Sequence, residues 1–173
     1  INGGGTVLYG SGTRGGVVNI ITKDRTKEGA SGKVYYQNSS YGTNKLGFDA
    51  GINYGNKFII DLGYENVNGK GYRRGSKEAY EYLNGSLKYN ITDNHSLKFK
   101  AARYNSEETL ASDLTKSQLL SDRRQSGTLS DLDVDRKEYS LGYEGKVTDN
   151  LKLSLTGYKQ DTNKIMYGMP KTK

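Results

Sequence analysis

The residues of this sequence that could perform catalysis or bind a metal are few, and they do not form a complete set. His95 is the single histidine, so a Ser/His/Asp arrangement can be built at most once, around a residue that we expect in a solvated turn. The acidic run at 131–135 has the alternate spacing of half a calcium loop, but the glycine that this loop needs is missing and Arg136 follows. We expect a solvated strand there. The sequence therefore predicts no catalytic residue, no metal site and no cofactor.

Two arginine pairs are better candidates for binding. Arg73 and Arg74 follow Tyr72 in one polar segment, and Arg123 and Arg124 lie in another. A guanidinium group can pair with a carboxylate, a phosphate or the anionic oxygens of a metal chelate, and the tyrosine can stack on an aromatic ligand. We predict these five residues as ligand contacts, and the alternative is that they are ordinary solvated surface arginines.

A glycine motif near the start of the sequence does not bind a nucleotide. Gly10, Gly12 and Gly15 match the dinucleotide pattern GxGxxG, which requires a following helix. The residues that follow, 16–22, are a β-branched run typical of a strand. The glycines are better explained by backbone geometry.

The elements that would position these residues are strands with one apolar and one polar face. Apolar and polar side chains alternate at 46–54, 60–65, 83–89, 97–102, 139–144 and 151–156, and a less regular strand is expected at about 32–40. The polar face would carry Asp49, Asp61, Glu65, Lys88, Lys98, Lys100, Glu144 and Lys152. A soluble two-sheet protein can show the same alternation with its apolar face inward.

The predicted connections alternate in length. Tight turns are expected at 55–57, 91–94 and 147–150, and long polar loops at 68–80 and 106–136. In an up-and-down sheet this order places the tight turns at one end of the strands and the long loops at the other end, as in outer-membrane barrels. Aromatic residues near the expected strand ends suggest two interfacial girdles: Tyr54, Phe58 and Tyr89 at the turns, and Tyr41, Tyr64 and Tyr104 at the loops.

Composition agrees with an all-β protein. The 173 residues include 23 Gly, 15 Tyr and 1 Pro, a balance that suits strands and tight turns rather than disorder. The absence of Cys excludes a disulfide framework and a Cys nucleophile. The longest apolar stretch, at 15–22, is too short for a membrane-spanning helix, and the net charge of +7 is scattered rather than gathered in a basic stripe.

The segment at 7–23 closely resembles the end of the plug domain of TonB-dependent outer-membrane receptors, whose pattern is LYGxxAxGGVINIITK. The matching positions that shape the plug are Leu8, Tyr9, Gly10, Gly15, Gly16 and Asn19, and Thr13 and Val18 depart mildly from the pattern. The resemblance implies a layout of plug end at 1–24, linker at 25–30 and barrel strands at 31–173.

This resemblance also implies a function. The family imports scarce nutrients, most often ferric siderophores, through a plugged transmembrane barrel of about 22 strands, of which this chain would supply about seven. It implies an outer membrane of the Gram-negative type, contact with outer-membrane lipid, an iron chelate or similar ligand, and a TonB complex that binds parts outside this chain. No enzymatic activity and no nucleic-acid partner are implied. The alternative function is a soluble or surface-attached β-sheet module that binds an anionic glycan or nucleic acid.

Overall fold

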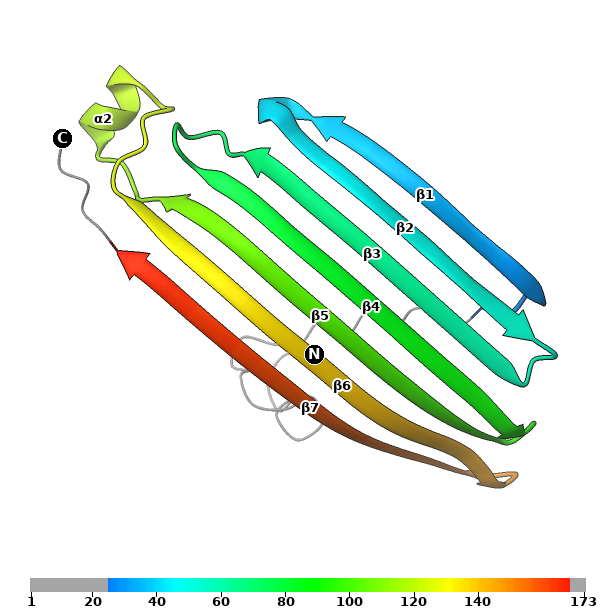
Figure 1. Ribbon diagram of the computed structural model, residues 1–173. Helices are drawn as coiled ribbons and strands as arrows, with labels where there is room; N and C mark the ends of the chain where they lie inside the picture. The colour runs from blue at the N-terminus through cyan, green and yellow to red at the C-terminus, as the bar shows by residue number, and fades with distance from the viewer. Residues whose placement is uncertain (1–24, 169–173) are drawn as a thin grey trace.

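A computed structural model describes residues 25–168 as one antiparallel sheet of seven strands in chain order (Figure 1). The fold is therefore all-β, as predicted. The strands are β1 (Gly29–Ser39), β2 (Thr43–Tyr54), β3 (Phe58–Lys70), β4 (Lys77–Thr92), β5 (His95–Ala111), β6 (Leu129–Thr148) and β7 (Leu151–Gly168). A 3-10 turn, η1 (Ser40–Gly42), joins β1 to β2, and a short helix, α2 (Lys116–Ser121), lies between β5 and β6. The plug-like motif at 7–23 lies outside the described residues.

The three tight turns lie together at one end of the strands, as predicted. Gly55 and Asn56 both have positive φ, 58° and 52°, and the Lys57 amide donates to the Tyr54 carbonyl over 3.0 Å. Positive φ at both central positions defines the hairpin turn whose twist matches that of its flanking strands. This turn fixes the register in which Tyr54 pairs with Phe58.

The strands on the opposite side are much longer than predicted, so the expected loops at 68–80 and 106–136 are wrong in extent. β3 continues to Lys70 and β5 to Ala111, which leaves connections only at 71–76 and 112–128. In the added segments both faces of the strands carry polar side chains, so the apolar alternation stops while the backbone ladder continues. A strand that is solvated on both faces does not show the alternation of apolar and polar residues by which strands are predicted.

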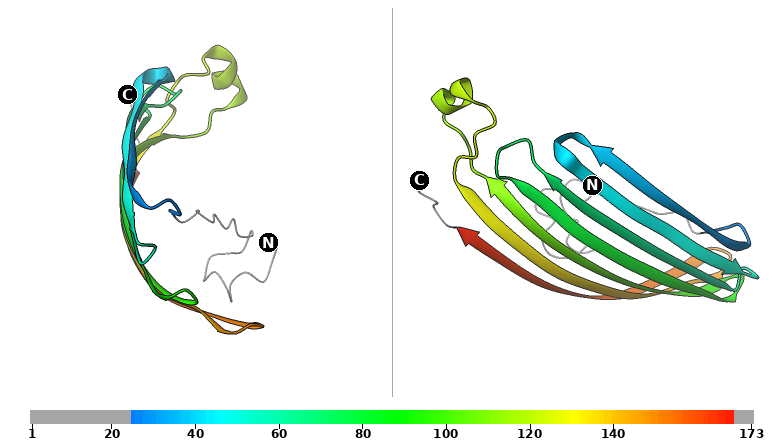
Figure 2. Two further views of the ribbon diagram at one scale, coloured as in Figure 1. Left: turned by 90° about the vertical axis from the view of Figure 1, so that its right-hand side faces the viewer. Right: turned by 45° about the horizontal axis from the view of Figure 1, so that its top comes forward.

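The sheet is curved, and the two faces are distinguished by what lies on them. Figure 2 shows that the described residues before β1, 25–28, lie on the concave side and that the loop carrying α2 leans over the same side. Arg25 in that segment pairs with Asp61 of β3 over 3.0 Å, so Asp61 belongs to the concave face. β1 begins at Gly29, inside the expected linker.

The convex face carries a continuous band of exposed apolar side chains. The register places Ile60, Leu87, Phe99 and Leu141 side by side on β3 to β6, and they are 40%, 41%, 45% and 56% exposed. The band continues on β2 through Leu46, Phe48 and Ile52 and on β7 through Leu153 and Leu155. Near the turns Phe58 stacks on Tyr89 with ring centroids 4.9 Å apart, which agrees with the expected girdle there.

The concave face is polar and of mixed charge. The register places all eight charged residues expected on this face together, including Asp49 and Glu65. Tyr104 also lies on this face, 5.8 Å from Tyr80, so its predicted place in an outward girdle is wrong. The alternation predicted at 97–102 continues along β5 to Tyr104, which therefore lies on the same face as Lys98.

The described residues form a single layer with almost no core. Ile59 and Val67 are the only hydrophobic side chains buried within residues 25–168. No helix in this range is long and apolar enough to cross a membrane. A one-layer sheet buries little apolar surface by itself and so gains little stability from burial. This sheet therefore needs another layer or lipid against its convex face and further strands at its two open edges.

Candidate functional site

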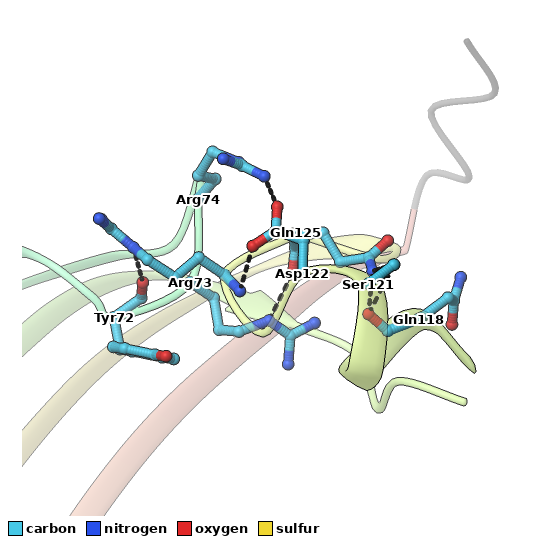
Figure 3. A network of polar contacts seen from close by, with 8 residues as sticks. Tyr72, Arg73, Arg74, Gln118, Ser121, Asp122 and Gln125 are labelled. Atoms are coloured by element: carbon cyan, nitrogen blue, oxygen red, sulfur yellow. Dashed lines mark hydrogen bonds and ion pairs between the residues drawn. The ribbon is translucent and has the colours of Figure 1, made fainter. Parts of the chain in front are cut away.

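The predicted ligand-binding residues lie together at the end of the strands opposite the tight turns. The β3–β4 loop at 71–76 contributes Tyr72, Arg73 and Arg74, which Figure 3 shows beside the β5–β6 loop. The β5–β6 loop at 112–128 contributes Arg123 and Arg124. Contacts between the two loops bring residues about 50 positions apart in the sequence within hydrogen-bond distance. The structure therefore brings all five together, although their roles differ.

Arg73 connects the two loops through hydrogen bonds to backbone carbonyls. Its guanidinium donates to the carbonyl oxygens of Ser112 at 2.9 Å and Ser126 at 3.2 Å, and its Nε donates to the carbonyl of Gln125. Ser76 in turn donates its hydroxyl hydrogen to the Arg73 carbonyl over 2.6 Å. Arg73 holds the longer loop by its backbone, so most of its donors are unavailable to a ligand.

Arg74 adds a second connection between the loops. Its guanidinium pairs with the carboxylate of Asp122, and its amide donates to the Arg124 carbonyl over 2.7 Å. The Asp122 carboxylate also accepts from the Arg124 amide at 2.9 Å, which fixes the turn after α2. Asp122 was not predicted, because an aspartate in a polar segment has no distinguishing pattern.

Arg124 lies against two aromatic rings from different loops. Its guanidinium carbon is 5.5 Å from the Tyr41 ring centroid and 5.9 Å from that of Tyr72, and its Nε donates to the Tyr72 carbonyl over 3.1 Å. The two rings meet edge to face at 5.7 Å. Tyr41 comes from η1, where its φ is 62°. The sequence predicted Tyr41 only as a girdle residue, so its part in this cluster was missed.

The helix α2 is stabilised locally. Thr115 and Gln118 form a capping box, in which the Thr115 hydroxyl accepts from the Gln118 amide and the Gln118 side chain accepts from the Thr115 amide. Gln125 donates its side-chain amide to the Gln118 carbonyl and ties the helix to the turn that follows (Figure 3). This capping stabilises a six-residue helix that buries none of its own side chains.

Arg123 differs from the other three arginines. Within residues 25–168 it makes no hydrogen bond or ion pair. It lines a hollow of about 660 Å³ between the loops. The other lining residues are Tyr72, Arg73, Asp113, Leu114 and Leu119. A cation, an aromatic ring and two leucines around one hollow suit an anionic ligand that also has an apolar or aromatic part.

A second hollow of about 570 Å³ lies on the concave face, far along the strands from the loops. Arg25, Asp61, Lys98, Lys100 and Glu138 give it charges of both signs. Tyr82, Asn84, Ser86, Ser140, Tyr158 and Gln160 also line it. Such a surface suits water or a polar protein segment rather than an apolar ligand.

Glu65 is the centre of a third polar group, on the concave face closer to the loops. Its carboxylate accepts from the hydroxyls of Tyr35 at 2.9 Å and Tyr80 at 2.7 Å, and pairs with the Lys45 ammonium at 2.7 Å. The four residues come from β1 to β4, so they connect these strands through side chains as well as backbone. This group is structural, because its donors are already satisfied by Glu65.

His95 is not the solvated turn residue that the sequence predicted. It is the first residue of β5, with its Nδ1 2.7 Å from the Tyr143 hydroxyl and the two rings stacked at 6.0 Å. The acidic residues at 131–135 lie within β6, as predicted.

The chain matches no known protein-family profile and no curated protein sequence. Its fold is similar to that of the ferric citrate transporter FecA, as seen in a crystal structure of the unliganded form. The TM-score is 0.78 and the sequence identity 25%, over 98% of this chain. The match covers 27% of that transporter's own length. The sheet is therefore similar to part of the barrel of an iron-chelate transporter.

Proposed function

We propose that this chain forms part of the barrel wall of an outer-membrane receptor that imports a ferric chelate with energy from TonB. The observation that carries the proposal is the division of one curved sheet into a convex apolar band and a concave charged face. Lipid would cover the convex face, and the concave face would border a hydrated lumen occupied by the plug. The open edges of β1 and β7 would pair with further strands of the barrel.

The loops would bind the chelate from outside the cell. Ferric chelates of this class carry anionic oxygens, and Arg123 with Tyr72 offers a cation and an aromatic face beside a hollow. The fold similarity to a ferric citrate transporter supports this class of cargo. Transport would consist of binding followed by a TonB-driven conformational change, with no covalent chemistry.

The first experiment uses the natural protein that contains this chain. Inner and outer membranes are separated by density, and the gel mobility of boiled and unboiled samples is compared. We expect recovery in the outer membrane with a heat-dependent mobility shift. A soluble protein without a shift would contradict the proposal and favour the soluble binding module.

The second experiment tests the cargo. Cells starved of iron are given radiolabelled ferric citrate, with and without a functional TonB. We expect uptake that depends on both the receptor and TonB. Uptake that continues unchanged without TonB would contradict the energised step, and binding of other iron chelates in place of ferric citrate would redefine the ligand within the same class.

A further inference from the structure

The residues that lead into the sheet are fastened to its concave face before β1 begins (Figure 2). Arg25 pairs through its Nε with Asp61 of β3 at 3.0 Å, and its Nη1 donates to the Ser31 hydroxyl of β1. The buried side-chain amide of Asn53 on β2 donates to the carbonyls of Arg25 at 3.2 Å and Thr26 at 3.3 Å. Three strands therefore hold two consecutive residues. We call Arg25, Ser31, Asn53 and Asp61 the entry clasp.

The ion pair of the clasp fits closely against the sheet. A Cβ atom at Gly51 would lie 2.6 Å from the Asp61 Oδ1 and 2.7 Å from the Arg25 Nε, so the pair occupies the space above a glycine. The Arg25 side chain is 20% exposed. Lys33 and Asp49 also pair on the concave face, at 3.1 Å, but their side chains are 69% and 49% exposed. Because solvent screens an exposed ion pair, the pair in the clasp is the stronger of the two.

The position of the clasp determines where a pull on the chain is resisted. β1 begins at Gly29, so a pull on the residues before Arg25 reaches the clasp before it reaches the strand. Without the clasp, the pull would act on the first hydrogen bonds between β1 and β2, and strands open locally from their ends. The clasp therefore protects the register of β1 with β2.

From these contacts we propose that Arg25 and Asp61 are positioning residues, which keep the chain fastened to the barrel wall while TonB pulls on the plug. The inference rests on the proposed function, because it takes the residues before Arg25 to be the end of the plug. The ion pair stays closed throughout transport, so the conformational change is confined to residues before Arg25. The moving part of the receptor therefore has a fixed boundary, and the plug does not leave the barrel as a free body.

The first test separates ligand binding from transport in the natural full-length protein. Asp61→Asn removes the charge that faces Arg25 and keeps the shape of the side chain. We expect radiolabelled ferric citrate to bind with unchanged affinity, and TonB-dependent uptake to fall about fivefold, the effect of losing one charge-assisted hydrogen bond. The double exchange Arg25→Asp with Asp61→Arg restores the ion pair and should restore uptake. The matched control is Asp49→Asn, which removes the exposed pair with Lys33 between two strand residues and should leave uptake unchanged.

The second test closes the clasp covalently. The 173 residues contain no cysteine, so Arg25→Cys with Asp61→Cys places one pair of thiols in this part of the protein. A short bifunctional thiol reagent then bridges the pair. We expect low uptake of ferric citrate before bridging, because the ion pair is lost, and uptake at the wild-type rate after bridging. A clasp that had to open during transport would instead give a bridged protein that binds ferric citrate and does not import it.

Two outcomes would overturn the inference: unchanged uptake in Asp61→Asn, or uptake that stays low after the bridge has formed. Each variant is first checked for a heat-dependent mobility shift, so that loss of transport is not confused with misfolding. A wild-type protein that shows no shift and does not enter membranes would refute the proposed function instead. A folded receptor that imports ferric citrate equally well with and without the ion pair would refute only the clasp.

Discussion

The side chain of Asn53 fastens the start of the sheet to its first tight turn. It is 1% exposed, and its amide donates to the carbonyls of Arg25 at 3.2 Å and Thr26 at 3.3 Å and to the Asn56 side chain at 2.8 Å. Its oxygen accepts from the Asn56 amide at 3.0 Å. One buried side chain therefore fixes where the chain enters β1 relative to the turn between β2 and β3.

Replacing Asn53 should destabilise the folded sheet. Asn53→Ala leaves buried carbonyls and an amide without partners, which we expect to cost about 1–3 kcal/mol of unfolding free energy. The measurement is urea denaturation of the folded protein in vesicles. Asn163→Ala, on the exposed convex side of β7, is the matched control and should change stability little. Equal effects of the two substitutions would mean that the contacts of Asn53 carry no net stability.

The loop arginines should separate into structural and ligand-binding residues. If the proposed function is correct, Arg123→Ala should weaken binding of the ferric chelate about tenfold, the effect of losing one charged contact, and leave loop order unchanged. Arg73→Ala should weaken binding and also increase proteolysis of the 112–128 loop, because it removes donors to three carbonyls of that loop. Limited proteolysis and ligand titration on the same samples distinguish the two. Increased cleavage in Arg123→Ala would contradict this division.

At the scale of the strands, Gly47 allows β1 and the group around Glu65 to fit together. Gly47 lies opposite Tyr35, and a Cβ at this position would overlap the Tyr35 ring, which crosses it to reach Glu65. An aromatic side chain on the neighbouring strand often packs over a glycine and covers the backbone that the glycine leaves exposed.

Gly47→Ala should therefore act through Tyr35. We expect a loss of about 1–3 kcal/mol from overpacking in the wild-type background and much less in a Tyr35→Ala background. Denaturation of the four proteins of this double-mutant cycle gives the coupling. Gly157→Ala, with nothing within 4 Å of its added Cβ, is the control. Additive effects of Gly47→Ala and Tyr35→Ala would exclude the contact as the cause.

The strands were predictable where one face is apolar, and their outer halves were not. The alternation at 139–144 identified part of β6, yet β6 begins at Leu129, because its first ten residues are held by backbone pairing with β5 and not by an apolar face. In the site, the arginine pairs in two polar segments led to the prediction of ligand contacts at Arg73 and Arg123, and ligand binding at these residues stays a prediction. Their different roles depend on carbonyl groups of the partner loop, which are the same for every residue type and leave no trace in the sequence.

For the whole molecule, the central question is what covers the convex face. β4, β5, β6 and β7 contain 16, 17, 20 and 18 residues, whereas a strand needs about 9–11 residues to cross a bilayer. The apolar band lies on the half near the tight turns, and the other half is polar on both faces. The proposed barrel would thus stand well above the membrane on the loop side.

A charge placed in the band should prevent insertion, and the same charge above the band should not. Leu141→Lys should cost about 2–4 kcal/mol if this face meets lipid. Asn105→Lys, on the same face between Glu81 and Asp135, should be neutral or slightly stabilising. The folded fraction after refolding into vesicles, read from gel mobility, measures both. Efficient insertion of Leu141→Lys would contradict a lipid-facing band.

The hydrogen bonds from Arg73 to the 112–128 loop also determine which residues of that loop can be substituted. Its three acceptors are backbone carbonyls of Ser112, Gln125 and Ser126, so none of those side chains is needed for the contact. Residues on the exposed surface of that loop can therefore be exchanged without loss of these three hydrogen bonds. The 112–128 loop thereby combines a backbone fixed by Arg73 with side chains that are free to change.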